Sequence, residues 1–299
     1  MSEDMQHDVA WEPVMVSVVI ACHNAERHIA TQLEALVGQE CPWPWEVVLS
    51  DNGSTDRTVA IAEAFRERLP SLSIVDSSTQ RGAAAARNCG VRTARGQWIV
   101  FCDADDEVAH GWLASMAKAL SDYPLVAARL DHERLNAPWA RSVRHLQTEL
   151  SQTTPAFLPY TYAAALGVQR SAHDLVGGFD ESLELACEDR DYCYRLQLAG
   201  VPLTLVPEAL VYYRHRDTMR GIYQQARAYG VGNVRMYRDY RHLGLQRPSA
   251  SRAVVSWLLT PVKLVLALAG RRRFSRFAAR MGWRVGRLEG SIRYRVWAP

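Results

Sequence analysis

The sequence predicts an α/β protein in which helices cover both faces of a mostly parallel sheet. Between Met15 and Leu130, short apolar runs alternate with segments whose apolar residues recur at helical spacing. The first run, Met15–Cys22, is almost wholly apolar, which is typical of a strand buried on both faces. The 299 residues are 48% hydrophobic and 22% charged. This balance excludes a disordered chain and favours one large domain with an appendage, or two smaller domains.

Four strand–helix units are expected in the first 130 residues. The strands are predicted at 15–22, 45–50, 72–77 and 97–102, and the helices at 25–38, 56–69, 82–94 and 107–120. Ligands of such sheets gather at the carboxyl ends of the strands. Polar side chains that follow these strands are therefore the first candidates for a functional site.

The pattern is less regular beyond residue 130, and residues 131–160 are polar. The later elements are expected as a strand at 162–169, a short helix and turn at 171–184, a helix at 188–200, two short strands within 201–216 and a long helix at 217–243. We therefore expect a main domain at 15–216, preceded by a disordered extension at 1–14. An amphipathic, Tyr/Arg-rich helical segment at 217–248 is expected to border the site.

The last segment, 249–299, is basic. From Arg252 onward it has eleven Lys or Arg residues and one acid, Glu289, whereas the rest of the chain has 24 basic and 31 acidic residues. The apolar run Val254–Ala269 is shorter than the roughly 20 residues that span a bilayer. Arginines among apolar and aromatic residues are typical of helices on an anionic membrane surface. We expect membrane-associating helices here; a homodimer contact or a lid packed on the main domain is the alternative.

Cysteine use and the N-terminus bear on location. The six cysteines form no CxxC pair, so neither a disulfide framework nor a zinc site is expected. The first residues, MSEDMQHDVAWEP, lack the basic and apolar regions of a secretory signal. We therefore expect a cytoplasmic protein, peripheral on the inner face of the cell membrane.

The densest group of acids follows the fourth predicted strand. In WIVFCDADDE, Asp103 and Asp105 stand two residues apart at a strand end and face the same side. Such oxygen ligands suit Mg²⁺ or Mn²⁺, which would complete its coordination with phosphate oxygens and water. Alternatively, Asp103 is a turn residue, and Asp106 and Glu107 favour the start of the next helix through its dipole.

Further polar residues end the first two strands. Asp51 ends the second strand in VVLSDNGSTDRT, where its carboxylate could accept a hydrogen bond from N3–H of uracil or thymine; an Asx turn is the alternative. His23, Asn24 and Glu26 follow the first strand. All four are expected at the same edge of the sheet.

Three later positions complete the candidates. Arg87 and Asn88 follow small residues in RGAAAARN, and Arg87 could face a phosphate or pair with an acid. Glu188 and Asp189 begin a helix, where they either complement its dipole or supply a general base for an attacking hydroxyl. His215 follows an apolar strand and is either a structural histidine or a further metal or phosphate contact.

In this order, the motifs resemble a family 2 glycosyltransferase with the GT-A fold, of the non-processive bacterial type. The resemblance covers roughly residues 15–215 and rests on VSVVIACHNAERHI, LSDNGSTDRT, RGAAAARNCGVRTARGQWIVFCDADD and GGFDESLELACEDRDYCYRL. It implies an α/β/α sandwich, a UDP-sugar or dTDP-sugar donor, Mg²⁺ or Mn²⁺, and inversion at the anomeric carbon. The QxxRW motif of processive members is absent, so a single transfer per encounter is expected.

The resemblance also implies roles for particular residues. Asp51 matches the acid that contacts the base, Asp103 and Asp105 match the metal-binding DxD pair, Asp189 matches the catalytic base with Glu188 beside it, and His215 falls at a further metal or diphosphate contact. Other donor contacts are expected at Ala21, His23, Asn24, Glu26, Arg87, Asn88 and Ala104. Ala21 and Cys22 replace a more usual Pro-x pair, so stacking of the nucleobase there is not implied.

The sequence therefore predicts an inverting, metal-dependent glycosyltransferase of cell-envelope glycan, polysaccharide or glycolipid synthesis, with a saccharide, lipid-linked or small-molecule acceptor and no nucleic acid partner. A natural-product glycosyltransferase acting on a small aglycone is the alternative, and a non-catalytic nucleotide-sugar-binding protein is a third hypothesis. A sugar nucleotidyltransferase would need a Gly-rich loop after the first strand. A haloacid-dehalogenase-type phosphatase would need a Thr or Val after its acids, which usually follow the first strand.

Overall fold

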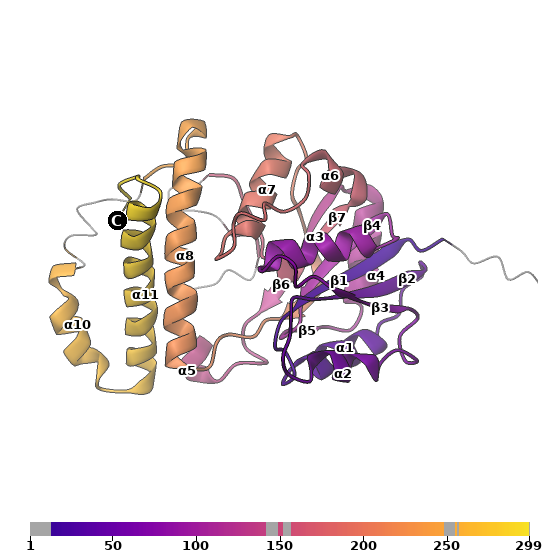
Figure 1. The fold of residues 1–299 in the computed structure, drawn as a ribbon, viewed down its shortest axis with the longest axis horizontal. Helices are drawn as coiled ribbons and strands as arrows, with labels where there is room; N and C mark the ends of the chain where they lie inside the picture. The colour runs from indigo at the N-terminus through magenta and orange to yellow at the C-terminus, as the bar shows by residue number, and fades with distance from the viewer. Residues whose placement is uncertain (1–12, 142–148, 152–156, 248–254, 256, 299) are drawn as a thin grey trace, which may run out of the picture.

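The computed structural model describes residues 13–141, 149–151, 157–247, 255 and 257–298. An eight-stranded sheet forms its centre, with helices on both faces, and further helices stand beside this sandwich (Figure 1). The expected α/β/α class, with a mostly parallel sheet, is confirmed. Apart from Pro13 and Val14, the predicted extension at 1–14 lies outside the described residues.

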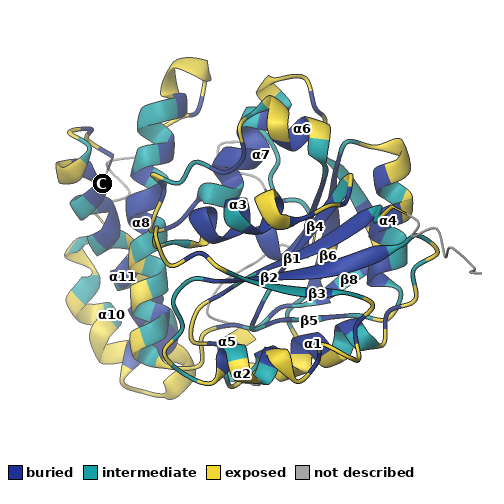
Figure 2. Cartoon of the chain, turned by 45° about the vertical axis from the view of Figure 1, so that its right-hand side comes forward, coloured by how far each residue is buried: buried dark blue, intermediate teal, exposed yellow. Residues whose placement is uncertain are grey.

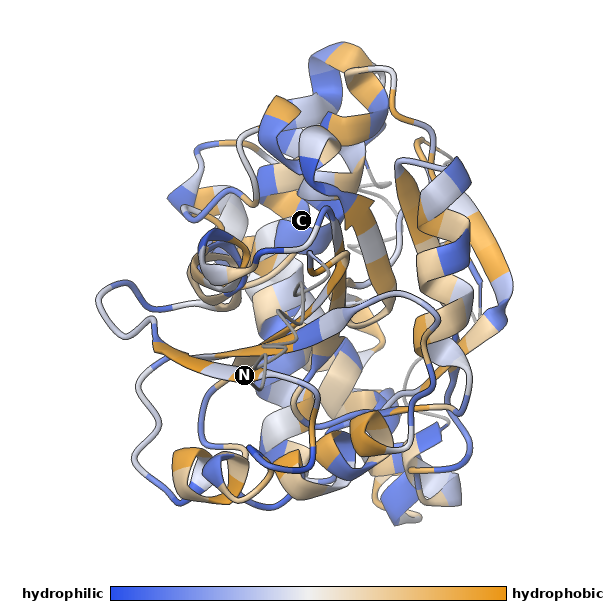
Figure 3. Cartoon of the chain, turned by 90° about the vertical axis from the view of Figure 1, so that its right-hand side faces the viewer, coloured by the Kyte–Doolittle hydropathy of each residue, from blue (hydrophilic) through white to orange (hydrophobic). Residues whose placement is uncertain are grey.

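Four strands of the first half of the chain run parallel. They are β1 (Val16–Cys22), β2 (Trp45–Asp51), β3 (Leu72–Asp76) and β4 (Trp98–Asp103), in the spatial order β3-β2-β1-β4. β1 and β2 are buried along almost their whole length, as expected for apolar strands covered on both faces. Figure 3 shows the central strands as mainly hydrophobic.

Helices form two layers around these strands, and Figure 2 shows their outer sides as exposed and the sheet between them as buried. One layer consists of α1 (Ile29–Val37), α2 (Thr58–Glu63) and α4 (Trp112–Asp122). The other consists of α3 (Ala83–Thr93), α6 (Arg170–Leu175) and α7 (Glu188–Leu198). α3 packs very closely, because a Cβ on Gly90 would collide with Val19 of β1.

The other half of the sheet is mixed. It contains β7 (Leu166–Gln169), β6 (Leu125–Asp131), β8 (Thr204–Tyr212) and β5 (Glu107–Val108). β7 pairs antiparallel with β4 and β6, β6 pairs in parallel with β8, and β5 pairs antiparallel with β8. A short helix, α5 (Pro138–Arg141), and a 3₁₀ turn, η1 (Ala163–Ala165), complete this region.

Several sequence predictions are wrong in this half. No strand is predicted where β6 lies. The two short strands expected within 201–216 are one strand, β8, whose register with β6 shifts near Pro207 and then resumes. Proline has no N–H to donate, so it interrupts the ladder without ending the strand. The helix expected from Glu107 begins only at Trp112, because Glu107 and Val108 pair with β8.

Two long helices pack in parallel along a seam of glycines. They are α8 (Met219–Tyr240), which a 3₁₀ turn, η2 (Arg241–Leu243), follows, and α11 (Arg271–Arg293). The α11 glycines that face α8 are four residues apart: Gly282, Gly286 and Gly290. A Cβ on Gly286 would overlap the carbonyl oxygen of Arg227, and Gly230 of α8 approaches α11 equally closely. α11, expected on a membrane surface, therefore buries one face on α8, because small residues let helix backbones approach.

The helix α10 (Thr260–Ala267) lies outside α11 (Figure 1). Its apolar residues and their neighbours are more than half exposed at Leu258, Val262, Val265, Leu266 and Leu268. Within the described ranges, no helix combines the length and the apolar character needed to cross a bilayer.

Candidate active site

The carboxyl ends of β2, β1 and β4 bring the predicted acids to one edge of the sheet. Asp51 lies beside Cys22 in the β1–β2 register, and Asp103 lies beside Ala21 in the β1–β4 register. The two aspartates therefore flank the end of β1. This is the edge at which open parallel sheets bind ligands.

A cavity of about 280 Å³ opens at this edge, between the end of β1 and the start of α3. Ala21 and His23, both predicted donor contacts, line it together with Asn52, Arg81 and Gly82. Arg81 is a cation at the cavity wall that the sequence analysis missed. Its place directly before Gly82 and the Ala-rich start of α3 is the signal that could have found it.

The carboxylate of Asp51 is buried and accepts a hydrogen bond from the backbone N–H of Ser54 at 3.1 Å. The Cys22 thiol lies 3.6 Å from the same carboxylate, and burial followed by the charge of Asp51 raises the pKa of this thiol. The hydrogen bond from Ser54 fits the interpretation of Asp51 as a turn residue. Its neighbours Cys22 and Asn52 line the cavity, so contact with a nucleobase stays a prediction.

The loop after β1 is tied to the loop after β2. His23 Nδ1 lies 3.0 Å from the carbonyl oxygen of Asn52, and Asn24 Oδ1 accepts a hydrogen bond from the Thr55 N–H at 2.8 Å. Glu26 Oε2 accepts a hydrogen bond from the Arg57 N–H at 3.2 Å. In this structure, Asn24 and Glu26 hold the two loops together.

The acidic cluster at the end of β4 has three members. Carboxylate oxygens of Asp103, Asp105 and Asp106 lie within 4.8 Å of one another, and Ala104 is buried between them in the chain. The alternative interpretation places Asp106 at the start of a helix. In the structure, Asp106 instead accepts a hydrogen bond from the Arg214 N–H at 2.7 Å. Sequence analysis missed its place in the cluster, because consecutive residues of a regular strand face opposite sides.

The cluster fits a divalent cation. Asp106 Oδ2 is buried and has no hydrogen-bond partner within the described residues. Burial, followed by the charges of Asp105 and Asp103, raises the pKa of Asp106 well above its usual value. Burial also raises the pKa of Asp105. Three crowded carboxylates with one unsatisfied oxygen suit a hard cation such as Mg²⁺ or Mn²⁺.

Two arginines pair with this cluster, and one of them also reaches the start of α7. Arg87 of α3 is buried and donates to Asp103 and to Glu188, each at 2.9 Å. Arg216, which follows β8, lies 3.0 Å from Asp105. Of the two interpretations of Arg87, the structure therefore shows the ion pair, which joins the two predicted halves of the site.

Asp189 lies in the first turn of α7, half-buried, with its carboxylate accepting a hydrogen bond from the Arg190 N–H at 2.7 Å. Burial, followed by the negative charge of Glu188, raises the pKa of Asp189 to about 7. A carboxyl group with a pKa near neutrality is suited to general-base chemistry. Asp191, in contrast, is paired with Arg195 at 2.7 Å.

A cavity of about 450 Å³ adjoins these carboxylates. Glu188, Asp189 and Arg216 line one part of it, and α8 lines another part with residues that include Gln225 and Tyr229. Arg216 therefore contacts the acidic cluster and also faces this second cavity. The Tyr/Arg-rich helix lies at the cavity wall.

Two further predicted site residues have contacts outside the acidic cluster. Asn88 donates to the carbonyl oxygen of Phe179 at 2.9 Å and to Glu181 at 2.8 Å, so it holds the turn before α7. His215 is buried, with its ring 5.2 Å from that of His132 and 5.5 Å from that of Tyr213. His215 is not a member of the acidic cluster that the described residues form.

Comparisons with known proteins identify the family of this chain. The model described as glycosyl transferase family 2 matches residues 17–178, and the one described as glycosyl transferase family group 2 matches residues 98–284. The pre-mycofactocin glycosyltransferase of Mycobacterium tuberculosis is 29% identical over 283 residues, covering 87% of this chain and 57% of that protein. The uncharacterized glycosyltransferase YibD of Escherichia coli is 35% identical over 126 residues, covering 42% and 34%. The chain therefore spans little more than half the length of the first relative, and less of the second.

Solved structures share the fold. The mannosyltransferase PcManGT from Pyrobaculum calidifontis, in complex with GDP-Man and Mn²⁺, matches with a TM-score of 0.62 at 18% identity, covering 93% of this chain and 89% of that one. TarS of S. aureus in complex with UDP-GlcNAc matches with a TM-score of 0.55 at 16% identity, covering 96% and 93%. Identities this low concern the fold alone.

Proposed function

The chain belongs to glycosyl transferase family 2, and we propose that it is an inverting, metal-dependent glycosyltransferase that moves a sugar from a nucleoside diphosphate to an acceptor hydroxyl. One observation carries this proposal. Arg87 joins Asp103, at the donor edge of the sheet, to Glu188, next to Asp189 at the acceptor-side cavity. Donor and acceptor groups would therefore meet across one cleft.

On the donor side, the nucleoside would bind at the end of β1, in the cavity that Ala21 and His23 line. Asp51 supports a uracil or thymine base, because its carboxylate can accept the N3–H. Asp103, Asp105 and Asp106 would hold Mg²⁺ or Mn²⁺, whose charge offsets that of the departing diphosphate. Arg81 of the donor cavity and Arg216 beside Asp105 would supply further positive charge to the donor phosphates.

On the acceptor side, Asp189 is the proposed general base. It would take the proton of the acceptor hydroxyl as the oxygen attacks the anomeric carbon, and the carbon–phosphate oxygen bond would break on the opposite side. A single in-line displacement inverts the anomeric configuration. The pKa near 7 keeps a substantial fraction of Asp189 ionised at neutral pH.

The acceptor is proposed to be a cell-envelope glycan, a polysaccharide or a glycolipid, with the protein peripheral on a membrane. The exposed leucines of α10, next to the basic α11, support membrane attachment. A small-molecule acceptor is the second candidate function, because the relative with the longest match described above is named for action on pre-mycofactocin.

The test measures nucleoside diphosphate released from a panel of nucleotide sugars with Mn²⁺. Wild type should hydrolyse one donor slowly without acceptor, and Asp105→Asn should abolish this. Asp122→Asn, an exposed acid at the end of α4, is the matched control and should keep full activity. If no donor is turned over in the presence of Mn²⁺ while nucleoside diphosphates still bind, the protein is a non-catalytic nucleotide-sugar-binding protein.

A further inference from the structure

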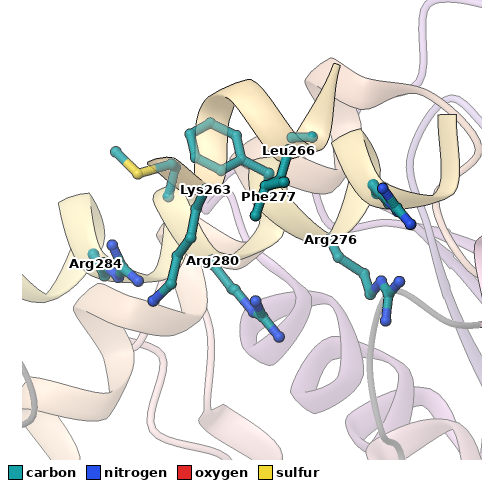
Figure 4. A pocket seen from close by; sticks show the side chains of 9 residues that line it. Lys263, Leu266, Arg276, Phe277, Arg280 and Arg284 are labelled. Carbon is teal, nitrogen blue, oxygen red and sulfur yellow. The ribbon is translucent and has the colours of Figure 1, made fainter. Parts of the chain in front are cut away.

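A groove between α10 and α11 combines a basic side with an apolar side. Five of its nine lining residues are basic and none is acidic, and it encloses about 350 Å³. Figure 4 shows Leu266 and Phe277 next to each other. The basic ends of Lys263, Arg276 and Arg280 extend away from this apolar pair.

Three of these cations have no acidic partner among the described residues. Lys263, Arg276 and Arg280 make no ion pair within the part of the chain that the structure describes. Glu289, the only acid after residue 252, is already paired with Arg227 at 2.7 Å. Cations that gather around a groove without carboxylates favour a bound anion, and Arg in particular suits phosphate.

The groove adjoins the proposed acceptor cavity. A second hollow, of about 540 Å³, shares Lys263, Arg280 and Arg284 with the groove. The same hollow shares Tyr229 of α8 with the cavity that Asp189 lines. Exposed leucines, a cluster of cations and the proposed catalytic base therefore follow one another along one side of the molecule.

We infer that the acceptor is carried on a phosphate-bearing amphiphile that binds in this groove. Its phosphate lies among Lys263, Arg280 and Arg284, its apolar tail lies along Leu266 and Phe277, and its hydroxyl-bearing end extends past Tyr229 toward Asp189. The inference rests on the proposed function and specifies its acceptor class. A polar aglycone would leave the apolar side of the groove unused, and a neutral lipid would leave the cations uncompensated.

The test measures the binding of monomeric dodecyl phosphate to the full chain by titration calorimetry. Dodecyl maltoside and inorganic phosphate are the matched probes, since the first keeps only the apolar tail and the second keeps only the phosphate. Dodecyl phosphate should bind to one site at least tenfold more tightly than either. Lys263→Gln combined with Arg280→Gln should weaken its binding at least tenfold. Arg272→Gln, an exposed α11 arginine outside both linings, should leave binding unchanged.

Four results would overturn the inference. The first is an affinity for inorganic phosphate equal to that for dodecyl phosphate. The second and third are unchanged binding of dodecyl phosphate in the double variant and equal weakening by Arg272→Gln. The fourth is binding to phosphatidylglycerol vesicles without binding of monomeric dodecyl phosphate, which would indicate surface attachment only. The donor-hydrolysis assay separates this inference from the proposed function. The double variant should hydrolyse donor at the wild-type rate, because Lys263 and Arg280 do not line the donor cavity. Its melting temperature should be unchanged, because neither side chain makes an ion pair within the described residues.

Discussion

Replacing Asp189 by Asn should abolish sugar transfer and, above neutral pH, stabilise the fold. Its pKa is raised from 3.8 to about 7 by burial and then by Glu188. A raised folded-state pKa means that the folded protein holds the proton more tightly than the unfolded chain does. The resulting stabilisation is complete below about pH 4 and is lost as pH rises through about 7. Asn is neutral at every pH, so it avoids this loss.

The magnitude follows from the size of the shift. About three pKa units correspond to ~4 kcal/mol of unfolding free energy as an upper limit. Asp189 is half-buried at the cavity wall, so solvent screening reduces this effect, and only part of the loss falls between pH 5 and pH 8. We therefore expect Asp189→Asn to gain about 1–2 kcal/mol on wild type over this interval.

The assay is urea unfolding at several pH values between 5 and 8, without metal or donor. The difference in unfolding free energy between Asp189→Asn and wild type should grow with pH up to about 7 and level off above it. Asp122→Asn should follow the wild-type curve, because Asp122 is exposed. Parallel curves for Asp189→Asn and wild type would show that the Asp189 carboxyl is not perturbed and would remove the physical basis of its role as a base.

Three further predictions concern activity and packing. Transfer by the wild type should rise with pH up to about 7 and level off above it, since Asp189 must be ionised to act, and a rate that is flat from pH 5.5 to 8.5 would contradict this. Arg87→Met should cost about 3 kcal/mol in urea unfolding, because it leaves two carboxylates without their shared partner, and Arg87→Lys should recover part of the loss; no change in midpoint would refute the ion-pair argument. Gly286→Ala should lower stability by about 1–3 kcal/mol, because its methyl group would overlap the Arg227 carbonyl, whereas Gly38→Ala, which has space, should be neutral.

The parallel half of the fold could be predicted from sequence because its strands are continuous apolar runs. Polar residues also follow these strands within one or two positions, so Asp51 and Asp103 could be assigned to the same edge of the sheet. β5, β6 and β8 could not be predicted in the same way. Their limits depend on pairing partners far along the chain, and pairing lets β8 continue through Pro207.

The candidate site was predictable where a residue's role follows from its place in a strand or helix. Asp106 was missed because the chain turns directly after β4 and brings a third carboxylate to the cluster. Asn88, predicted beside Arg87 as a donor contact, donates a hydrogen bond to the Phe179 turn, whereas Arg87 faces the acidic cluster. Only the three-dimensional arrangement distinguishes two adjacent helix residues in this way.

The glycine seam between α8 and α11 determines where this chain can be divided. A fragment that ends near residue 248, a natural choice from composition, would lack the helix against which Gly230 packs. The inner side of α8 would then face water with a surface shaped for a missing partner. α8 also forms a wall of the cavity beside Asp189. Because α11 packs on α8, the basic C-terminal segment is part of the scaffold that shapes the acceptor side.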